Sequence, residues 1–273
     1  MSDFFAALTE YTFIQNAIIA CLLASIACGL IGSYVVVKRI SFLTGGIAHS
    51  VLAGMGMAYY YQASPILGAI VAALVSGVLI GWINLRWKEH EDILIAAFWS
   101  AGMAIGILFL SRTPGYNVDL MSYLFGNILL ITTQDLWLMF FMDVVIFSIV
   151  LLFYKQFLAS VFDEEFARLK GINTELFYIL LLCLISITIV ILIQLVGLIL
   201  VIALLTLPAA IANQYVTSLH KMFLFSALIC AVISISGVAI SFGPDLPTGS
   251  VIVVIACACY FTSMFMKRTL GNK

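Results

Sequence analysis

Long intervals without a charged residue dominate this sequence. Residues 40–85 contain no Lys, Arg, Asp or Glu, and neither do residues 176–219. An apolar stretch of about 20 residues is enough to cross the hydrocarbon of a bilayer as a helix. Only 9% of the 273 residues are charged, whereas a soluble domain carries about a quarter. The chain is therefore expected to be an all-α integral membrane protein.

Divided by length, the uncharged intervals predict about nine transmembrane helices in one bundle. Residues 40–85 are long enough for two spans separated near 62–65, and residues 176–219 for two joined by a tight turn near 194–197. Eight spans are the alternative. An outer-membrane barrel is excluded, because it requires short segments of alternating hydrophobicity. The other five predicted spans are 11–37, 93–111, 128–154, 222–244 and 246–266.

The basic residues orient these spans. With nine spans and the N-terminus outside, every Lys and Arg except Arg112 falls on the cytoplasmic side, as the positive-inside rule requires. A single crossing by residues 176–219 would instead place Lys221 and the basic C-terminus outside. Two crossings are therefore favoured there. The whole chain, 1–273, is expected to form a single transmembrane domain.

Composition and motifs exclude several functions. The net charge of −1 leaves no basic surplus for nucleic acid. No phosphate loop, zinc-protease motif or serine-hydrolase motif occurs in the sequence, so no catalytic residue and no enzymatic activity are expected. The six cysteines lie in apolar runs and are expected to be small buried hydrophobic residues.

A short helix is predicted in the internal loop at about 162–172. Asp163 can cap its first free amides, and Glu164 stands at the positive end of the helix dipole. Arg168 stands at the negative end, and Gly171 can supply the left-handed turn that ends the helix. These end signals predict the helix itself but not its purpose.

One face of this loop helix is apolar, because Phe162, Phe166 and Leu169 recur at helical spacing. Two interpretations follow. The helix lies on the bilayer surface, or it docks onto a cytoplasmic partner.

His49 is the ionisable residue of the second predicted span. Such residues are costly in a membrane and are functional candidates by default, and imidazole is a common metal ligand. The alternative is a histidine that forms a hydrogen bond across a helix contact. Small residues surround it on the same helical face: Gly45, Ala53 and Gly56. Gly46, Ser50 and Gly54 repeat at four-residue spacing, a pattern that lets another helix approach closely.

Three further polar or irregular features are noted. Asp143 falls near the middle of the fifth span and is expected to face the bundle interior. Pro208 is expected to kink the seventh span, as a structural hinge or as a gate. The external segment 119–127, which begins at Asp119, is either a lid or partner contact or a packing element.

Taken in order along the chain, four motifs resemble the membrane subunits of bacterial ABC importers for zinc, manganese and iron(II). They are RISF at 39–42 leading to GIAHS at 46–50, DLMSYLFG at 119–126, FDEEFARLKG at 162–171 and LPAA at 207–210. The resemblance covers most of the chain. It implies a permease of the bacterial cytoplasmic (inner) membrane, surrounded by lipid and assembled as a homodimer.

The resemblance also implies partners and a substrate. The partners are two copies of a separate ATPase, which binds ATP, and an extracytoplasmic metal-binding protein. This chain would hold no cofactor of its own. Its substrate would be a divalent transition metal, with zinc expected ahead of manganese or iron. The rival class is an ion-coupled secondary transporter, which would use Asp143 and His49 for protons and need no ATPase.

The resemblance assigns roles to individual residues. The internal loop helix becomes the ATPase-coupling helix, with Asp163, Glu164, Phe166, Ala167, Arg168 and Gly171. His49 becomes a candidate metal ligand, and Asp143 is added as a candidate because it is the deepest acid within the spans. Family members commonly carry an Asp four residues before this His, where this chain has Gly45. The residues assigned to helix packing or gating are Gly45, Gly46, Ser50, Gly54 and Pro208.

Overall fold

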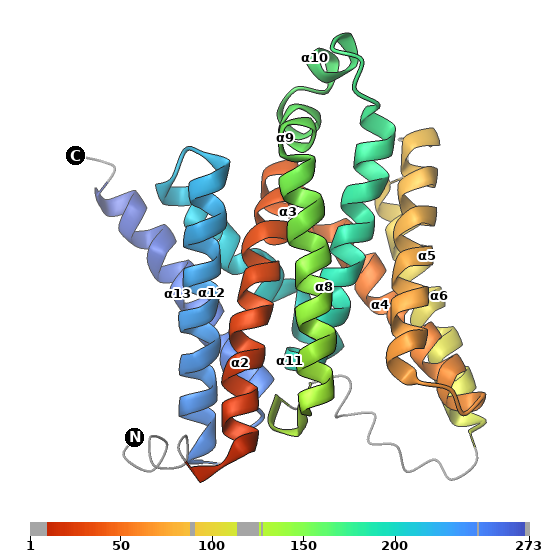
Figure 1. Ribbon diagram of the computed structural model, residues 1–273, viewed down its shortest axis with the longest axis vertical. Coiled ribbons are helices and arrows are strands. Elements are labelled where there is room, and N and C mark those ends of the chain that lie inside the picture. Colours follow the sequence, from red (N-terminus) through yellow and green to blue (C-terminus); the bar gives the residue numbers. More distant parts are fainter. Residues whose placement is uncertain (1–9, 88–90, 114–125, 127, 245, 271–273) are drawn as a thin grey trace. The chain divides into compact units, whose positions relative to one another are not determined.

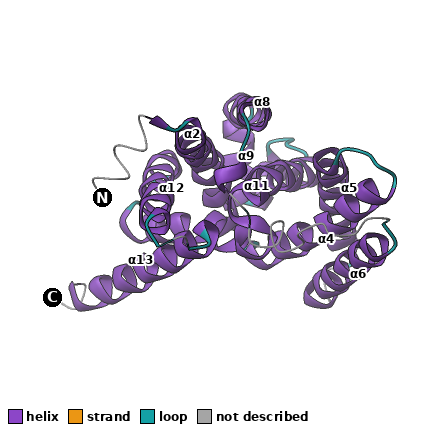
Figure 2. Cartoon of the chain, turned by 90° about the horizontal axis from the view of Figure 1, so that it is seen from below, coloured by secondary structure: helices purple, strands orange, loops and turns teal. Residues whose placement is uncertain are grey.

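The computed structural model describes residues 10–87, 91–113, 126, 128–244 and 246–270. Every regular element in these ranges is a helix (Figure 2). The predicted all-α class is therefore confirmed. The chain divides into two compact units: residues 1–36, 120–147 and 191–273 form unit 1, and residues 37–119 and 148–190 form unit 2.

Unit 1 contains the helices at the two ends of the chain (Figure 1). A π-helical turn, Cys28–Gly32, interrupts its first long helix, where Gly29 lies against Ala227 of α12. The absence of a side chain at Gly29 permits this contact, because an added Cβ would lie 2.6 Å from the Cβ of Ala227. Its complete helices are α2 (Thr12–Ala27), α12 (Leu219–Phe242) and α13 (Thr248–Leu270).

Unit 2 is built on three consecutive long helices, α4 (Ser41–Tyr60), α5 (Pro65–Arg86) and α6 (Glu91–Ser111). The short helices α9 (Tyr154–Phe162) and α10 (Glu164–Leu169) complete it. Three helices contain residues of both units: α3 (Ser33–Lys38), α8 (Thr133–Leu152) and α11 (Thr174–Tyr215).

Seven helices of the described chain are long and apolar enough to cross a membrane. The other two predicted spans correspond to α4, rich in Gly, Ser and Tyr, and to the shorter apolar helix Leu200–Tyr215. The helical membrane class is thus supported, whereas the predicted count of nine is not confirmed. The seven are Thr12–Lys38, Pro65–Arg86, Asp92–Ser111, Thr133–Leu152, Thr174–Leu198, Leu219–Phe242 and Thr248–Thr269.

A break divides α11, as the sequence predicted near 194–197. Gly197 has φ 76° and ψ 172°, far from helical values. Glycine adopts a positive φ without the steric cost that a Cβ imposes. Pro208 lies inside the helical stretch that follows, and the departure from helical dihedrals is at Gly197 instead.

The break in α11 lies against Gly126, which also has a positive φ of 71°. A Cβ added to Gly126 would lie 2.6 Å from the carbonyl carbon of Val196 and 2.9 Å from the carbonyl oxygen of Leu195. Contacts of this kind with backbone atoms leave no room for a side chain.

Close glycine contacts hold α4 between α5 and α6. Gly54 of α4 lies against the backbone of Gly68 and the Cβ of Ala72, both in α5. On the α6 side, a Cβ at Gly56 would lie 2.9 Å from the Cα of Gly106. The small residues of α4 therefore serve contacts within this chain.

The contact at Gly54 gives a stability prediction. Gly54→Ala would force its Cβ into the carbonyl group of Gly68 and to 2.5 Å from the Cβ of Ala72. Overpacking of this kind costs about 1–3 kcal/mol. We expect a lower unfolding temperature in detergent, measured by differential scanning fluorimetry. Gly243→Ala is the control, because nothing lies within 4 Å of a Cβ at that position. Equal stability of the two variants would contradict the packing described.

Candidate functional site

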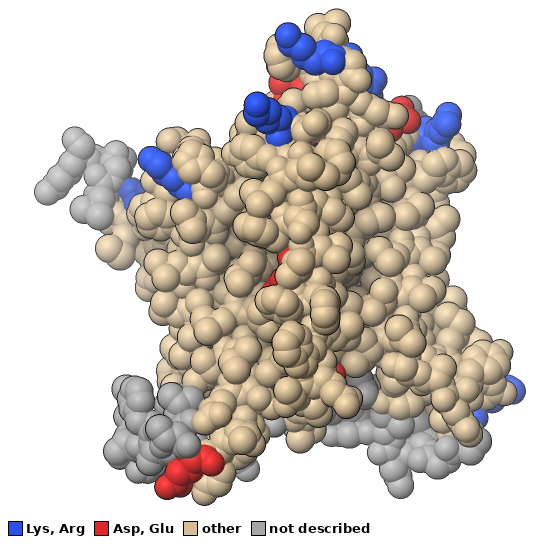
Figure 3. All heavy atoms as spheres, viewed as in Figure 1, with Lys and Arg blue, Asp and Glu red and all other residues tan. Residues whose placement is uncertain are grey.

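The predicted loop helix is present as α10, which lies beyond the ends of α5 and α11 within its unit (Figure 1). The Asp163 carboxylate accepts a hydrogen bond of 2.9 Å from the Phe166 amide and so caps the helix start. Arg168 forms an ion pair of 2.8 Å with Glu164 one turn earlier. Basic side chains gather around this end of the unit, above apolar helices (Figure 3).

The end of α10 is equally well defined. Gly171 has φ 77°, its amide donates to the Arg168 carbonyl, and the Ile172 amide donates to the Ala167 carbonyl at 3.0 Å. This is a glycine-ended helix stop of the Schellman type. Both ends of the helix are thus held by local hydrogen bonds, so α10 is a pre-formed element.

An apolar face of the α9–α10 segment is exposed. Phe162 is 61% exposed, Phe166 50% and Leu169 88%. Ala167 points inward and is fully buried. The Lys170 ammonium lies 5.5 Å from the centre of the Phe166 ring. Three large exposed apolar side chains at the end of α9 and on α10, bordered by charges, have the character of a protein interface.

His49 is buried in unit 2 with 5% of its surface exposed, and its Nδ1 atom has no hydrogen-bond partner. Its ring stacks on Trp99 of α6, with centroids 3.9 Å apart and planes inclined by 15°. A Cβ at Gly102 would lie 3.2 Å from the His49 carbonyl oxygen, so α6 is in close contact with α4 here. The ring is held by packing, which leaves one buried nitrogen available.

The contact between His49 and Trp99 was not predicted from the sequence. Trp99 lies in the uncharged interval assigned to the fourth span. No spacing rule relates a residue of one span to a residue of another, so small neighbours alone were expected around His49. The only available signal was a large aromatic residue in an adjacent span.

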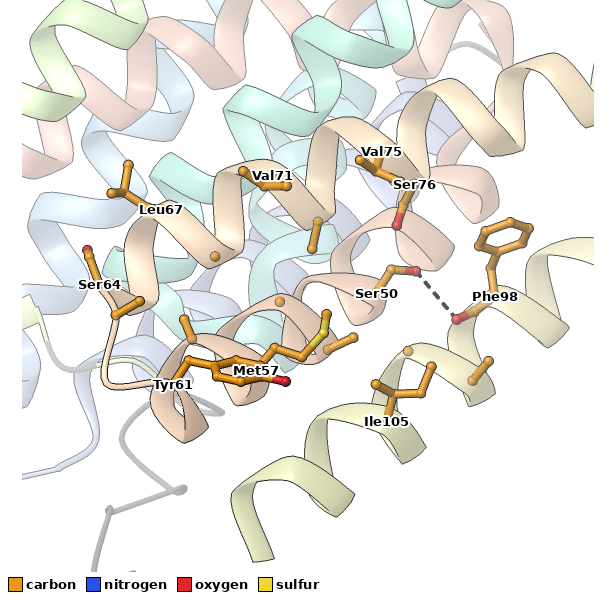
Figure 4. Close-up of a pocket in the computed structure, with 18 residues that line it drawn as sticks. Ser50, Met57, Tyr61, Ser64, Leu67, Val71, Val75, Ser76, Phe98 and Ile105 are labelled. Atoms are coloured by element: carbon orange, nitrogen blue, oxygen red, sulfur yellow. Dashed lines mark hydrogen bonds between the residues drawn. The ribbon is translucent and has the colours of Figure 1, made fainter. Parts of the chain in front are cut away.

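An apolar groove of about 600 Å³ is bounded by α4, α5 and α6 (Figure 4), and His49 is not among the described residues that line it. Ser50 is part of its lining and donates hydrogen bonds to the carbonyls of Gly46 (2.7 Å) and Phe98 (3.4 Å). None of the described residues that line the groove is charged. Such a surface cannot replace the hydration shell of a divalent ion, so the groove is not itself an ion site.

Asp143 belongs to unit 1 and is also buried, with 5% of its surface exposed. Neither carboxylate oxygen has a hydrogen-bond partner among the described residues. His49 belongs to unit 2. Among the described residues, no group of three or more His, Cys, Asp or Glu side chains could hold a metal ion.

The remaining predicted residues are distributed as follows. Gly45 is buried in α4, one turn before His49. Asp119 lies outside the described residues. All six cysteines are free, and Cys21, Cys28 and Cys230 are buried.

These features define a multispanning helical membrane protein with a buried intramembrane histidine and an exposed apolar loop helix. Residues 10–267 match the ABC 3 transport family. The chain therefore belongs to that family.

Relatives of nearly full length support this assignment. A probable metal transport system membrane protein of Chlamydia pneumoniae is 41% identical, over 92% of this chain and 87% of the relative. The manganese transport system membrane protein MntC of Halalkalibacterium halodurans is 31% identical, over 99% and 93%. A solved structure, PsaBC from Streptococcus pneumoniae in complex with Fab, is 30% identical with a TM-score of 0.87, covering 96% of this chain and 94% of that one.

The chain is accordingly a membrane permease of the metal ABC importer family and a multi-pass protein of the bacterial inner membrane. Permease subunits are not themselves enzymes. The class and location predicted from the sequence are thus confirmed.

Proposed function

We propose that this chain forms the translocation pathway of an ATP-driven importer for manganese. Similarity to two groups of relatives supports manganese over the expected zinc. The relatives named manganese transport proteins match 98–99% of this chain at 31–32% identity. The manganese import system permease protein ScaB of Streptococcus parasanguinis is 30% identical over 97% of it. None of the relatives cited here is named for zinc.

The exposed α10 helix is the structural feature that supports an ATPase-driven mechanism. The chain has no phosphate loop, so ATP must be bound by another subunit. The pre-formed α10 helix exposes Phe166 and Leu169, and Phe162 at the end of α9 is exposed as well, so the segment offers an apolar anchor for such a subunit. The proposed assembly has two copies of this chain, two copies of the ATPase and an extracytoplasmic metal-binding protein that supplies the ion.

His49 is the proposed first protein ligand of the ion inside the membrane. Imidazole and carboxylate are both suitable ligands for a divalent transition metal. The described residues of one chain hold no complete ligand set, and Gly45 occupies the place where the family resemblance implies an acid. In a homodimer the second copy supplies another His49, and Asp143 is the proposed additional acid within the bilayer.

The proposed topology has nine spans in one transmembrane domain, with α4 and Leu200–Tyr215 as the two crossings beyond the seven apolar helices. It places the 216–218 connection on the cytoplasmic side. A single cysteine introduced at Thr217 into a cysteine-free variant should react with an impermeant maleimide only in inverted vesicles. Reaction only in intact cells would refute the double crossing of residues 176–219.

Metal accumulation in cells tests the proposed function. A strain expressing this chain with its ATPase and binding protein should accumulate radioactive manganese faster than the same strain lacking the permease. Unlabelled manganese should compete more strongly than zinc or iron(II). Stronger competition by zinc would show that zinc is the preferred substrate. Accumulation without the ATPase would favour a secondary transporter.

A further inference from the structure

A polar cluster joins the elements on both sides of α10 to the start of the helix that carries His49. We call it the Lys38 junction and define it as Lys38, Asn84, Ser160 and Tyr178. All four residues belong to unit 2. They come from four different helices: α3, α5, α9 and α11.

Lys38 contacts the helix that precedes α10. Its ammonium donates a hydrogen bond of 3.2 Å to the carbonyl oxygen of Ser160, near the end of α9. The last carbonyls of a helix have no partner within the helix, and a lysine near them interacts favourably with the helix dipole. Ser160 is buried, and the bond itself is half-buried.

Lys38 also contacts the helix that follows α10. Its ammonium lies 5.5 Å from the centre of the Tyr178 ring, in the range of a cation–π interaction. The Tyr178 hydroxyl accepts a hydrogen bond of 2.7 Å from the Asn84 amide of α5. One turn before Tyr178, Thr174 accepts a hydrogen bond of 3.1 Å from Arg168 of α10 itself. Arg168 therefore bonds α10 to α11, and Lys38 contacts both α11 and α9, the helices that flank α10.

The connection from Lys38 to α4 is short and constrained. Only Arg39 and Ile40 separate Lys38 from the first residue of α4. Arg39 has φ 60°, a left-handed conformation that a side chain other than glycine rarely adopts. Ile40 is buried. A displacement of Lys38 therefore reaches α4 through a backbone with little freedom to absorb it, and α4 carries His49.

We propose that Lys38 is a positioning residue of the transport cycle, which transmits movement of the α9–α11 segment to the His49-bearing helix. The inference rests on the proposed function, because it assigns the source of that movement to an ATPase bound at α10. Lys38 touches neither the ion nor ATP. It acts by keeping the start of α4 in a fixed position relative to the α9–α11 segment.

The test measures manganese transported per ATP hydrolysed by the complete complex in proteoliposomes. Lys38→Met keeps the aliphatic stem but removes the ammonium. We expect a complex that assembles and hydrolyses ATP while transport per ATP falls roughly 2- to 30-fold, the range for loss of one coupling contact. Lys38→Arg, which retains a donor for the Ser160 carbonyl, should recover most of the ratio.

A double-variant comparison keeps the proposal testable if Lys38→Met also lowers protein yield. Tyr178→Leu should lower transport per ATP, and the Lys38→Met, Tyr178→Leu double variant should lose little more than either single variant. An unchanged ratio in Lys38→Met, or parallel loss of hydrolysis and transport, would overturn the positioning role. A wild-type complex without ATP-dependent manganese transport would instead overturn the proposed function.

Discussion

Replacing His49 by phenylalanine is expected to abolish manganese uptake while the protein still inserts and binds its ATPase. Phenylalanine can keep the stacking on Trp99, which lies 3.9 Å from the imidazole centroid, but it has no nitrogen for a metal. Loss of a residue that merely orients a ligand costs roughly 10–100-fold in metal affinity, so loss of the ligand itself should cost at least as much. The measurement is uptake of radioactive manganese in cells.

Two comparisons isolate the role of the imidazole. His49→Ala should abolish uptake as well, with an added loss of stability because the stack is removed. His220→Ala, at an exposed position of α12, should transport normally. Asp143→Asn should give a smaller loss than either His49 variant. Wild-type uptake by His49→Phe would show that His49 only packs against Trp99.

Combining Phe166→Ala with Gly171→Val is expected to abolish association with the ATPase without preventing membrane insertion. An aromatic anchor at an interface contributes about 2 kcal/mol or more, which corresponds to roughly 30-fold in affinity. Gly171 has φ 77° and open space around it, so valine there would distort the helix stop through backbone strain alone. Pull-down of the ATPase by the tagged permease measures the effect.

Phe225→Ala is the matched control for this variant. Phe225 is 49% exposed, nearly the same as Phe166 at 50%, but it lies on α12, one of the apolar helices of membrane-spanning length. Its replacement should leave ATPase association intact. Normal association and uptake by the double variant would show that α10 lies on the lipid surface instead.

The features that the sequence predicted are those that depend on residues close together in the chain. Charge-free intervals predicted the membrane helices, and Asp163 and Gly171 predicted the ends of the loop helix because capping involves residues close in sequence. The break near 194–197 also depends on a local property of the chain. Gly197 has a φ of 76°, which glycine adopts without the steric cost of a Cβ. Pro208 lies inside the helix that follows this break, and the kink expected there stays a prediction.

Contacts between helices were not readable in the same way. Nothing in the sequence indicates that His49 stacks on Trp99 or that Lys38 bonds to Ser160, because these pairs come from separate helices. The four-residue spacing of Gly46, Ser50 and Gly54 predicted a close helix contact without naming the neighbour. The structure shows Gly54 against α5 of the same chain. Zinc was expected ahead of manganese and iron, but sites of this kind select a metal by geometry and availability rather than by ligand type alone, and the sequence does not give that geometry.

ATP-dependent manganese flux into proteoliposomes tests the central claim most directly. The vesicles contain the purified complex of this permease with its ATPase, and the metal-loaded binding protein is added outside. We predict accumulation of radioactive manganese when ATP is enclosed, and none with a non-hydrolysable analogue or without the binding protein. Equal accumulation in the absence of ATP hydrolysis would contradict the assignment of this chain as the permease of an ATP-driven importer.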